Sequence, residues 1–333
     1  MLALKPKAEN VPDIPVQVVE NFMKFPDPNA RYLMGEGIGV ARNSQGMIYV
    51  NTCSQQTRVL EFDPNGNFTR EIGKDLLGHI WCHGVRVDPQ DNIWSIDSGS
   101  NMMIRFNPAG RVTMLIGRRP EYPVSGLESA PDAFEDSADA PRYIFNRPTD
   151  VAFDAQGNIF VADGYRNARV VKYDKDGRFV AQAGSRGSGP GQMTTPHAIA
   201  VGPNGDVYVG SRSDQRIVVF DNDLNYKTVY DNVGAPWSLC IGPASQPFLW
   251  TSNSNPDSNP AASWDITGEV YKMELDGTII GKFGRAGKGP GEFATTHQMD
   301  CRDPNVIYTA EINNWRSQKI LLRPQAMKPS TQE

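Results

Sequence analysis

Three histidines recur at one position of a repeated pattern, although the 333-residue chain contains only four histidines. His83, His197 and His297 each stand directly before a short apolar run that ends in a turn. Imidazole is a common ligand of zinc and of other divalent transition metals, and catalytic zinc sites often combine three protein ligands with an open fourth position. The recurrence therefore predicts a tris-histidine metal site, provided that the fold brings the three side chains together. His79 lies outside the pattern and is given no such role.

Six copies of a strand–turn–strand unit surround these histidines. The clearest copy runs from Val151 to Val161, and a second pair of apolar runs follows it, from Arg169 to Phe179. Four short strands in each unit, with no long helical periodicity, predict an all-β fold, a six-bladed β-propeller whose stacked blades bury the faces that one blade leaves open. The inner runs of the other five units begin at Val40, Val85, Ile199, Leu239 and Met299.

The three histidines belong to the second, fourth and sixth units. Adjacent blades of a six-bladed propeller are about 60° apart, so alternate blades approach the central axis from directions about 120° apart. The position before each inner strand should lie at one mouth of the channel, where three imidazoles can meet. Around the ring this position is occupied by Ile38, His83, Thr149, His197, Trp237 and His297.

The two ends of the chain predict how the ring closes. The sixth unit ends with the run from Lys319 to Pro324 and has no fourth strand, whereas the run from Val16 to Phe22 precedes the first unit. We expect the N-terminal run to pair as the outer strand of the last blade, which would cover a free sheet edge. Residues 1–333 then form one propeller domain, and residues 118–143 form an inserted loop between blades two and three.

Composition excludes some classes of partner. The net charge is −5 and the isoelectric point is about 5.5, without a basic cluster, so nucleic acid is not an expected partner. No apolar run reaches the roughly 18–20 residues of a membrane span. The first residues lack the pattern of a signal peptide, which predicts a cytoplasmic location.

The four cysteines are scattered and form no CxxC pair, so we expect buried, reduced thiols. The oligomeric state is left open.

The repeats resemble a known family. The Gly-rich loops before His197 and His297 resemble those of NHL-repeat propellers, as does the Asp-x-x-Gly-x-Ile-Phe-Val pattern from Asp154. More narrowly, the stretches 145–152, 161–169 and 196–200 are similar to the lyase domain of the peptide-amidating enzymes, peptidylglycine amidoglycolate lyase. In that family three histidines from alternate blades hold a catalytic zinc ion, and they match the three recurring histidines here.

The resemblance also implies an activity. A metal-dependent lyase of this kind cleaves the N–C(OH) bond of a carbinolamide, giving an amide and an aldehyde such as glyoxylate. The tyrosine of the family's Asp-Gly-Tyr motif matches Tyr165, which would act as the base if the charge of a zinc ion, or another divalent transition metal, favours its phenolate. An arginine of the following blade matches Arg212, which would hold a carboxylate or carbonyl group. The substrate would be a small molecule or a short peptide-like molecule.

Three departures from the family's pattern bear on this reading. A substrate-contacting arginine of the family falls in the stretch 51–55, which contains none here. The aspartate that helps to bind a structural Ca²⁺ is replaced by Gln298, so that site lacks one ligand. A cysteine of the Asp-Gly-Tyr blade is replaced by Arg166. Recognition of a peptidyl-glycine carboxylate and binding of Ca²⁺ are therefore open.

Two other functions fit the same sequence. The histidine site could activate water for metal-dependent hydrolysis of a lactone, an ester or an amide. The stretch 34–37 resembles the acidic entry motif of gluconolactonase-like propellers, with Glu36 as ligand or base, although that family uses Asp, Glu and Asn around calcium. Alternatively, the chain is a non-catalytic NHL scaffold that binds a protein on one face. Residues that could line an interface or a pocket are Asn255, Pro256, Asp257, Asn259, Trp264 and Trp315.

Overall fold

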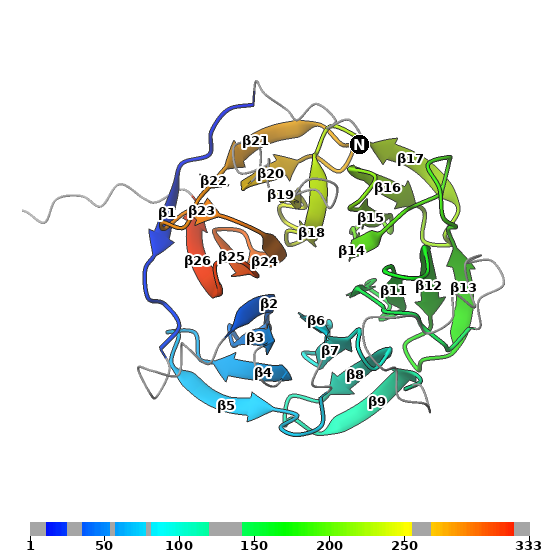
Figure 1. Ribbon diagram of the computed structural model, residues 1–333, viewed down its shortest axis with the longest axis horizontal. Coiled ribbons are helices and arrows are strands. Elements are labelled where there is room, and N and C mark those ends of the chain that lie inside the picture. Colours follow the sequence, from blue (N-terminus) through cyan, green and yellow to red (C-terminus); the bar gives the residue numbers. More distant parts are fainter. Residues whose placement is uncertain are drawn as a thin grey trace, which may run out of the picture.

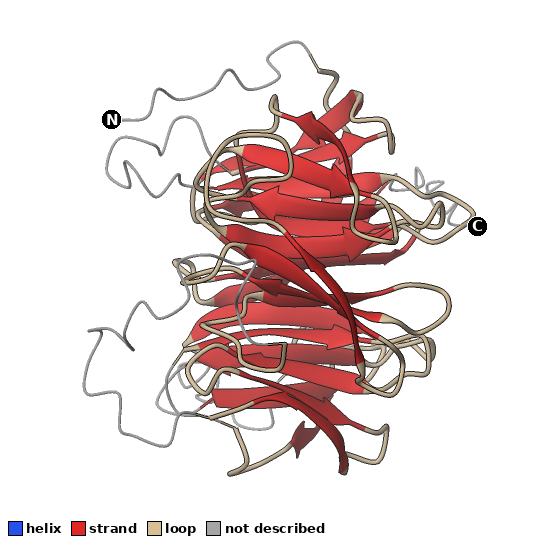
Figure 2. Cartoon of the chain, turned by 90° about the vertical axis from the view of Figure 1, so that its right-hand side faces the viewer, coloured by secondary structure: helices blue, strands red, loops and turns tan. Residues whose placement is uncertain are grey.

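The chain forms six four-stranded antiparallel sheets around a central axis (Figure 1). The structure is a computed structural model that describes residues 11–24, 35–53, 57–77, 81–119, 142–254 and 268–322. Every regular element in these ranges is a strand, and none is a helix long and apolar enough to cross a bilayer. The side view in Figure 2 shows the strands joined by loops on both faces of the disc. The predicted all-β, six-bladed propeller is confirmed.

Each blade runs from an inner to an outer strand. Blade one contains β2 (Glu36–Arg42), β3 (Ile48–Cys53), β4 (Thr57–Phe62) and β5 (Phe68–Ile72); blade two contains β6 (Cys82–Val87), β7 (Ile93–Asp97), β8 (Met102–Phe106) and β9 (Val112–Gly117); blade three contains β10 (Asp150–Phe153), β11 (Ile159–Asp163), β12 (Arg169–Tyr173) and β13 (Phe179–Ala183).

The second half of the ring repeats this order. Blade four contains β14 (Pro196–Val201), β15 (Val207–Ser211), β16 (Arg216–Phe220) and β17 (Tyr226–Tyr230); blade five contains β18 (Ala235–Ile241), β19 (Leu249–Ser254), β20 (Glu269–Met273) and β21 (Ile279–Phe283); blade six contains β24 (Thr296–Asp303), β25 (Val306–Glu311), β26 (Arg316–Leu322) and β1 (Val16–Val19). A short parallel pair, β22 (Arg285–Ala286) and β23 (Glu292–Phe293), connects blades five and six.

The N-terminal strand closes the ring as the sequence predicts. β1 pairs with β26 in antiparallel register, with Val16 opposite Leu322 and Val18 opposite Ile320. The last blade therefore gains its fourth strand from the start of the chain. The predicted inserted loop lies mostly outside the described residues, since residues 120–141 are not among them.

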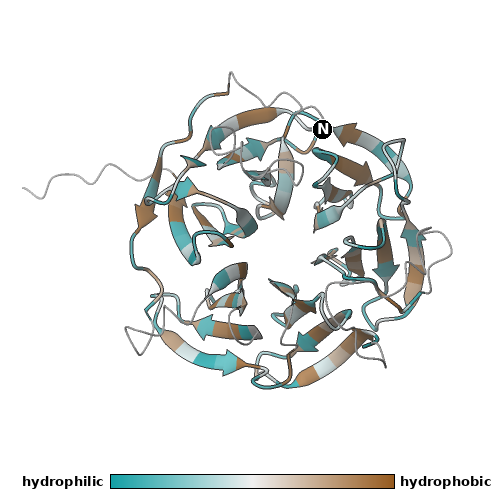
Figure 3. Ribbon diagram, viewed as in Figure 1, coloured by the Kyte–Doolittle hydropathy of each residue, from teal (hydrophilic) through white to brown (hydrophobic). Residues whose placement is uncertain are grey.

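The core lies between blades rather than within one layer. Six clusters of buried apolar side chains occupy the six blade-to-blade interfaces, as between blades two and three, where Trp94 and Ile96 contact Val151 and Val161. In Figure 3 hydrophobic stretches accordingly recur in the strands around the whole ring. Because each blade covers both neighbours, no single blade can be removed without exposing two apolar faces.

Asp-x-x-Gly turns connect the strands, as in the turn from Asp154 to Asn158. The Asp154 carboxylate accepts hydrogen bonds from the backbone N–H groups of Gln156 and Asn158, at 3.0 and 2.8 Å. Gly157 has φ of +84°, a conformation that side chains disfavour. These local requirements explain why aspartate and glycine recur at the turns, so that the turns could be predicted from the sequence.

All four cysteines form disulfides, so the prediction of reduced thiols is wrong. Cys53 is bonded to Cys82, and Cys240 to Cys301, across sequence separations of 29 and 61 residues. Both bonds link adjacent blades: one joins blade one to blade two, and the other joins the inner strands of blades five and six. Cysteine spacing along the chain does not reveal such pairs, because it does not show which strand positions of two neighbouring blades face each other.

We expect the two disulfides to be chemically closed and stabilising. The unfolded, unreduced protein should take up no iodoacetamide, and the reduced protein should take up four equivalents, measured by intact mass. Replacing Cys240 and Cys301 by serine should lower the free energy of unfolding in urea by about 2–4 kcal/mol, because the bridge restricts the unfolded chain. Alkylation of the unreduced protein would contradict the assignment.

Candidate metal centre and active site

The three recurring histidines are bulged residues of the inner strands. His83, His197 and His297 are each the second residue of β6, β14 or β24, and the register with the neighbouring strand shifts at each of them. The sequence placed these residues just before the strands, whereas the structure places them inside. A β-bulge leaves one residue unpaired and turns its side chain out of the regular alternation. The bulges therefore direct the imidazoles toward the axis.

A carbonyl group from the following blade orients each imidazole. His83 Nδ1 bonds the carbonyl of Thr149, and His197 and His297 bond the carbonyls of Trp237 and Ile38, both at 2.7 Å. A carbonyl can only accept, so Nδ1 carries the proton in each ring and Nε2 is left with a lone pair. This outer partner fixes the tautomer and the ring orientation, as it does for histidines that bind metals.

The three rings meet on the axis, deeply buried. They are 2–4% exposed, with ring centroids 4.6–4.8 Å apart. Burial lowers the pKa of all three, well below the usual value for His83 and His197 and to about 3 for His297; neighbouring charges, including Arg212, add to this effect. The imidazoles are therefore neutral near pH 7, the form that binds metal.

The three buried histidines can hold one metal ion. One ligand nitrogen from each ring lies within 4.8 Å of the other two, and no further histidine, cysteine or carboxylate of the described ranges joins this group. Three neutral nitrogens with oriented outer partners fit zinc or another divalent transition metal with room for a further ligand.

The hydroxyl of Tyr165, a residue singled out in the sequence, lies beside the triad. It is 2.9 Å from His83 Nε2 and 3.3 Å from His197 Nε2. Since both imidazoles carry their proton on Nδ1, the hydroxyl donates to an Nε2 lone pair. A substrate oxygen bound to a metal at the triad would lie beside this hydroxyl.

A buried ion pair holds the loop that carries Tyr165. Asp163 and Arg169 are both fully buried, and Arg169 Nε donates to the Asp163 carboxylate at 2.9 Å. The same carboxylate accepts from the backbone N–H of Asn146 at 2.9 Å. Gly164 has no room for a side chain, because an added Cβ would lie 1.7 Å from the carbonyl oxygen of Pro196. These contacts explain the Asp-Gly-Tyr sequence.

Arg212 approaches Tyr165 from blade four. Its Nη1 is 3.5 Å from the Tyr165 hydroxyl, and its guanidinium stacks on the ring of Trp237, 4.0 Å from the centroid. Arg212 is only 7% exposed, and Trp237 in turn contacts the ring of His197 at 5.0 Å. The guanidinium is thus fixed beside the triad rather than free in solvent.

Other predicted site residues are not brought into the triad. Glu36 is the first residue of β2, partly buried, and burial raises the pKa of its carboxyl group; it does not belong to the metal-binding group. Trp315 is 62% exposed in the loop between β25 and β26. The candidate interface residues Asn255, Pro256, Asp257, Asn259 and Trp264 lie outside the described residues.

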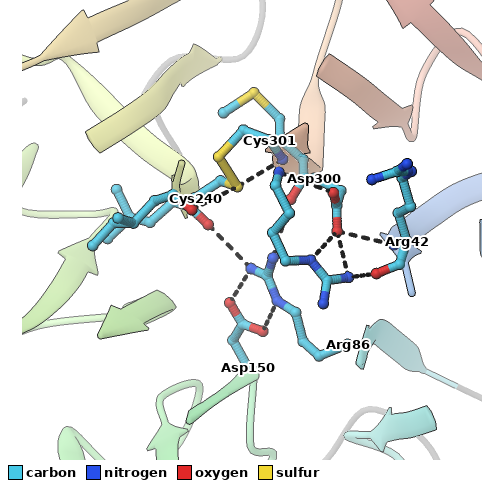
Figure 4. The surroundings of a disulfide bond; sticks show 10 residues. Arg42, Arg86, Asp150, Cys240, Asp300 and Cys301 are labelled. Carbon is cyan, nitrogen blue, oxygen red and sulfur yellow. Dashed lines mark hydrogen bonds and ion pairs between the residues drawn. A yellow bond between two sulfur atoms is a disulfide. The ribbon is translucent and has the colours of Figure 1, made fainter. Parts of the chain in front are cut away.

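A guanidinium fills the axis beneath the triad, which the sequence did not predict. Arg86 donates two hydrogen bonds to the Asp150 carboxylate, at 2.9 and 2.6 Å, and others to the carbonyls of Met299 and Leu239, at 3.0 and 3.2 Å (Figure 4). Carboxylate and carbonyl oxygens are also the ligands of Ca²⁺. Here the guanidinium already takes them, and Gln298 replaces a carboxylate nearby. This oxygen set does not fit a calcium ion.

Comparisons with known proteins extend these findings. The family model DUF5128, described as a 6-bladed beta-propeller, matches residues 144–246. Peptidyl-glycine alpha-amidating monooxygenase A of Xenopus laevis is 32% identical over 268 residues, 77% of this chain and 26% of the relative. Peptidyl-alpha-hydroxyglycine alpha-amidating lyase 1 of Drosophila melanogaster is 26% identical over 81% of this chain and 49% of the relative. The chain is therefore similar to proteins named amidating lyases and amidating monooxygenases. The predicted resemblance is confirmed.

The homologues also include NHL propellers, and most are longer than the matched region. NHL repeat-containing protein 3 of Homo sapiens is 31% identical over 65% of this chain and 60% of the relative. The chain spans 16% of the rat amidating monooxygenase, and about a quarter to a half of the amphibian and insect relatives.

Solved structures share the fold. A streptogramin B lyase superposes with a TM-score of 0.57 at 13% identity, covering 93% of this chain and 98% of that chain. A gluconolactonase from Xanthomonas campestris superposes with a TM-score of 0.59 at 15% identity, covering 96% and 97%. A lyase and a lactonase are thus equally good matches in fold, so the choice of reaction depends on the site.

We expect the triad to bind one transition-metal ion per chain. Elemental analysis of the purified protein should find about one zinc or similar ion, and replacement of His83, His197 or His297 by alanine should each weaken binding at least tenfold, because a ligand is lost. The His79→Ala variant is the matched control and should keep its metal. A wild-type protein that binds no metal after reconstitution would exclude the site.

We also expect the axial ion pair to dominate local stability. Arg86→Met leaves the Asp150 carboxylate buried without its cation and should lower the free energy of unfolding by about 3–5 kcal/mol. The control Arg285→Met removes a guanidinium that is 81% exposed and paired with Glu292, and should cost no more than about 1 kcal/mol. Urea unfolding measures both, and equal effects would contradict the assigned role.

Proposed function

We propose that the chain is a metal-dependent lyase, most consistent with zinc, that cleaves the N–C(OH) bond of a carbinolamide to an amide and an aldehyde such as glyoxylate. The observation that carries the proposal is the Tyr165 hydroxyl, which lies within hydrogen-bond distance of the Nε2 atoms of two converging, neutral histidines. Homology to proteins named amidating lyases supports the same reaction class.

The histidines would hold the ion through their Nε2 atoms, while their Nδ1–H groups stay bonded to carbonyls. A bound divalent ion supplies a Lewis acid that polarises the hydroxyl oxygen of the substrate. The burial of the triad excludes bulk water, which strengthens electrostatic interactions within the site.

Tyr165 would move the proton. As phenolate, its oxygen takes the proton of the substrate hydroxyl, and the electrons of the O–H bond form the new C=O bond as the C–N bond breaks. The electron pair of the C–N bond goes to the nitrogen, which takes the proton from Tyr165 and leaves as the amide, so that the phenolate is regenerated. No oxidant is consumed and no water is added.

Arg212 would stabilise the charge that develops. With Nη1 3.5 Å from the tyrosine oxygen, its guanidinium can favour negative charge on that oxygen, and it can also bind a carboxylate on the reacting carbon. Stacking on Trp237 keeps the guanidinium in place. This single arginine would replace the carboxylate recognition that the family assigns to the stretch 51–55.

The buried site bears on the size of the substrate, and the disulfides bear on the compartment. We propose a small or short peptide-like substrate, since the reacting atoms must reach a narrow, buried triad. Disulfides persist in oxidising compartments, so we propose that the chain works in one, in place of the cytoplasmic location expected from its first residues.

Replacing Tyr165 by phenylalanine tests the proposal. With an N-acyl-α-hydroxyglycine as substrate, kcat for glyoxylate release should fall about 10²–10⁴-fold, because the proton acceptor is lost, while the metal content stays unchanged. The control Tyr143→Phe removes an exposed hydroxyl that accepts from the backbone of Phe179, and should leave kcat unchanged. A blank without protein corrects for spontaneous breakdown of the carbinolamide.

The acyl product separates lysis from hydrolysis. Lysis in H₂¹⁸O gives an unlabelled carboxamide, whereas hydrolysis of the amide bond gives a carboxylic acid with one ¹⁸O. Labelled acid would favour the alternative in which Glu36 or the triad activates water. A wild-type protein that binds no metal and turns over no substrate would leave only the non-catalytic scaffold.

A further inference from the structure

Two stacks of a guanidinium on an aromatic ring flank Tyr165. The inner stack, Arg212 on Trp237, belongs to the proposed mechanism. The outer stack consists of Arg147, whose Cζ lies 4.7 Å from the ring centroid of Trp81. The Trp81 ring meets the Tyr165 ring edge-on, at 6.1 Å between centroids. The outer stack has no part in the proposed reaction, yet it contacts the residue that performs it.

The outer stack is held in an unfavourable backbone conformation. Trp81 and Arg147 have φ of 66° and 60°, the left-handed region that bulky side chains avoid. The carbonyl of Trp81 accepts from the N–H of Gly99 at 3.2 Å, and the N–H of Arg147 donates to Asn101 Oδ1 at 2.8 Å. The surrounding blades therefore impose this placement. Such strain concentrates at sites where a side-chain position is needed for function.

The charge of Arg147 is not matched by a counterion in the described part of the chain. Its guanidinium is partly buried, and no carboxylate of the described ranges lies within ion-pair distance of it. Burial and the nearby charge of Arg166 lower its pKa. Four other arginines that are buried or partly buried are paired with carboxylates: Arg86 with Asp150, Arg169 with Asp163, Arg216 with Asp214, and Arg316 with Glu311.

These observations favour an anionic ligand beside an apolar surface. A partly desolvated guanidinium gains most from a carboxylate, which it can bind through two hydrogen bonds. The Trp81 side chain is 39% exposed and offers the neighbouring apolar surface. Trp81 directly precedes β6 of blade two, whereas Trp237 lies in β18 of blade five, on the opposite side of the ring (Figure 1). A molecule bound at the triad would therefore reach the outer stack with the part remote from Arg212.

We propose that Trp81 and Arg147 form an outer subsite that selects carbinolamides whose acyl part carries a carboxylate. This inference rests on the proposed lyase function and specifies its substrate class. One carboxylate on the reacting carbon binds Arg212, and the second, at the end of the acyl chain, binds Arg147 while the chain packs on Trp81.

Substrate preference tests the subsite. N-glutaryl-α-hydroxyglycine carries the second carboxylate, and its terminal carboxamide is the neutral isostere. The wild type should prefer the acidic substrate at least about tenfold in kcat/KM, mainly through KM. Arg147→Gln should abolish this preference and leave turnover of the neutral substrate within about twofold, and Arg147→Lys should keep part of it. The matched control is Arg105→Gln, which removes a guanidinium stacked on Trp94 at 5.8 Å and should keep the full preference.

A binding measurement separates failure of the subsite from failure of the reaction. N-glutarylglycine lacks the hydroxyl and cannot react, and its affinity for the metal-loaded protein can be compared by calorimetry with that of its neutral isostere. Equal kcat/KM for both substrates in an active wild type overturns the subsite and leaves the lyase proposal standing. The wild type could bind N-glutarylglycine more tightly than the neutral isostere, while Arg147→Gln binds the two equally. Together with the absence of turnover by the wild type, that result supports the subsite and overturns the lyase. If the wild type binds N-glutarylglycine and its neutral isostere equally, as Arg147→Gln is expected to do, the subsite is overturned whether or not the protein is an active lyase.

Discussion

The inner strands of a propeller impose a constraint on everything near its axis. Each innermost strand is a sheet edge, so some of its N–H and C=O groups face the axis without a strand partner, and burial there makes unpaired groups costly. In this chain side chains from neighbouring blades satisfy several of them. Gln298 Oε1 accepts from the N–H groups of Val40 and Val85, at 3.0 and 3.2 Å. Asp150 accepts from the N–H of Ile199 at 3.1 Å, and Arg86 donates to carbonyls of blades five and six.

The same constraint produces the candidate metal centre one layer above. The carbonyls of Ile38, Thr149 and Trp237 also face the axis, and each is taken by the Nδ1–H of a histidine from the preceding blade. The hydrogen bonds that satisfy the carbonyls of blades one, three and five thus orient the imidazoles of blades six, two and four. Because the six inner strands are joined in pairs by these hydrogen bonds, the histidines come from every second blade. It leaves three Nε2 atoms pointing at one another, an arrangement that only a shared cation or a hydrogen-bond donor can relieve.

What the sequence could reveal depends on whether a feature is local. The Asp-x-x-Gly turns and the recurring histidines are short patterns that repeat in register, so the blades, the ring closure and the converging triad could be predicted. The bulges that place His83 inside β6 shift the register by a single residue and have no clear signal. The disulfides, the Arg86–Asp150 pair and the Trp81–Arg147 stack each join residues of different blades. Their partners are set by the ring, not by spacing, and only the finished fold brings them together.

The charge balance of the site limits what it can bind. Three neutral imidazoles would leave the charge of a bound divalent ion uncompensated. The guanidinium of Arg86 is paired with Asp150, and that of Arg212 lies 3.5 Å from the Tyr165 hydroxyl. The uncompensated charge of such an ion would favour an anionic ligand, either hydroxide or a substrate with an oxyanion and a carboxylate. Hydroxide would lead to hydrolysis, whereas a substrate of the second kind would lead to the proposed lysis. An anionic carbinol of the proposed class would supply both groups, and the Tyr165 hydroxyl lies within hydrogen-bond distance of the histidine nitrogens at which its hydroxyl would bind.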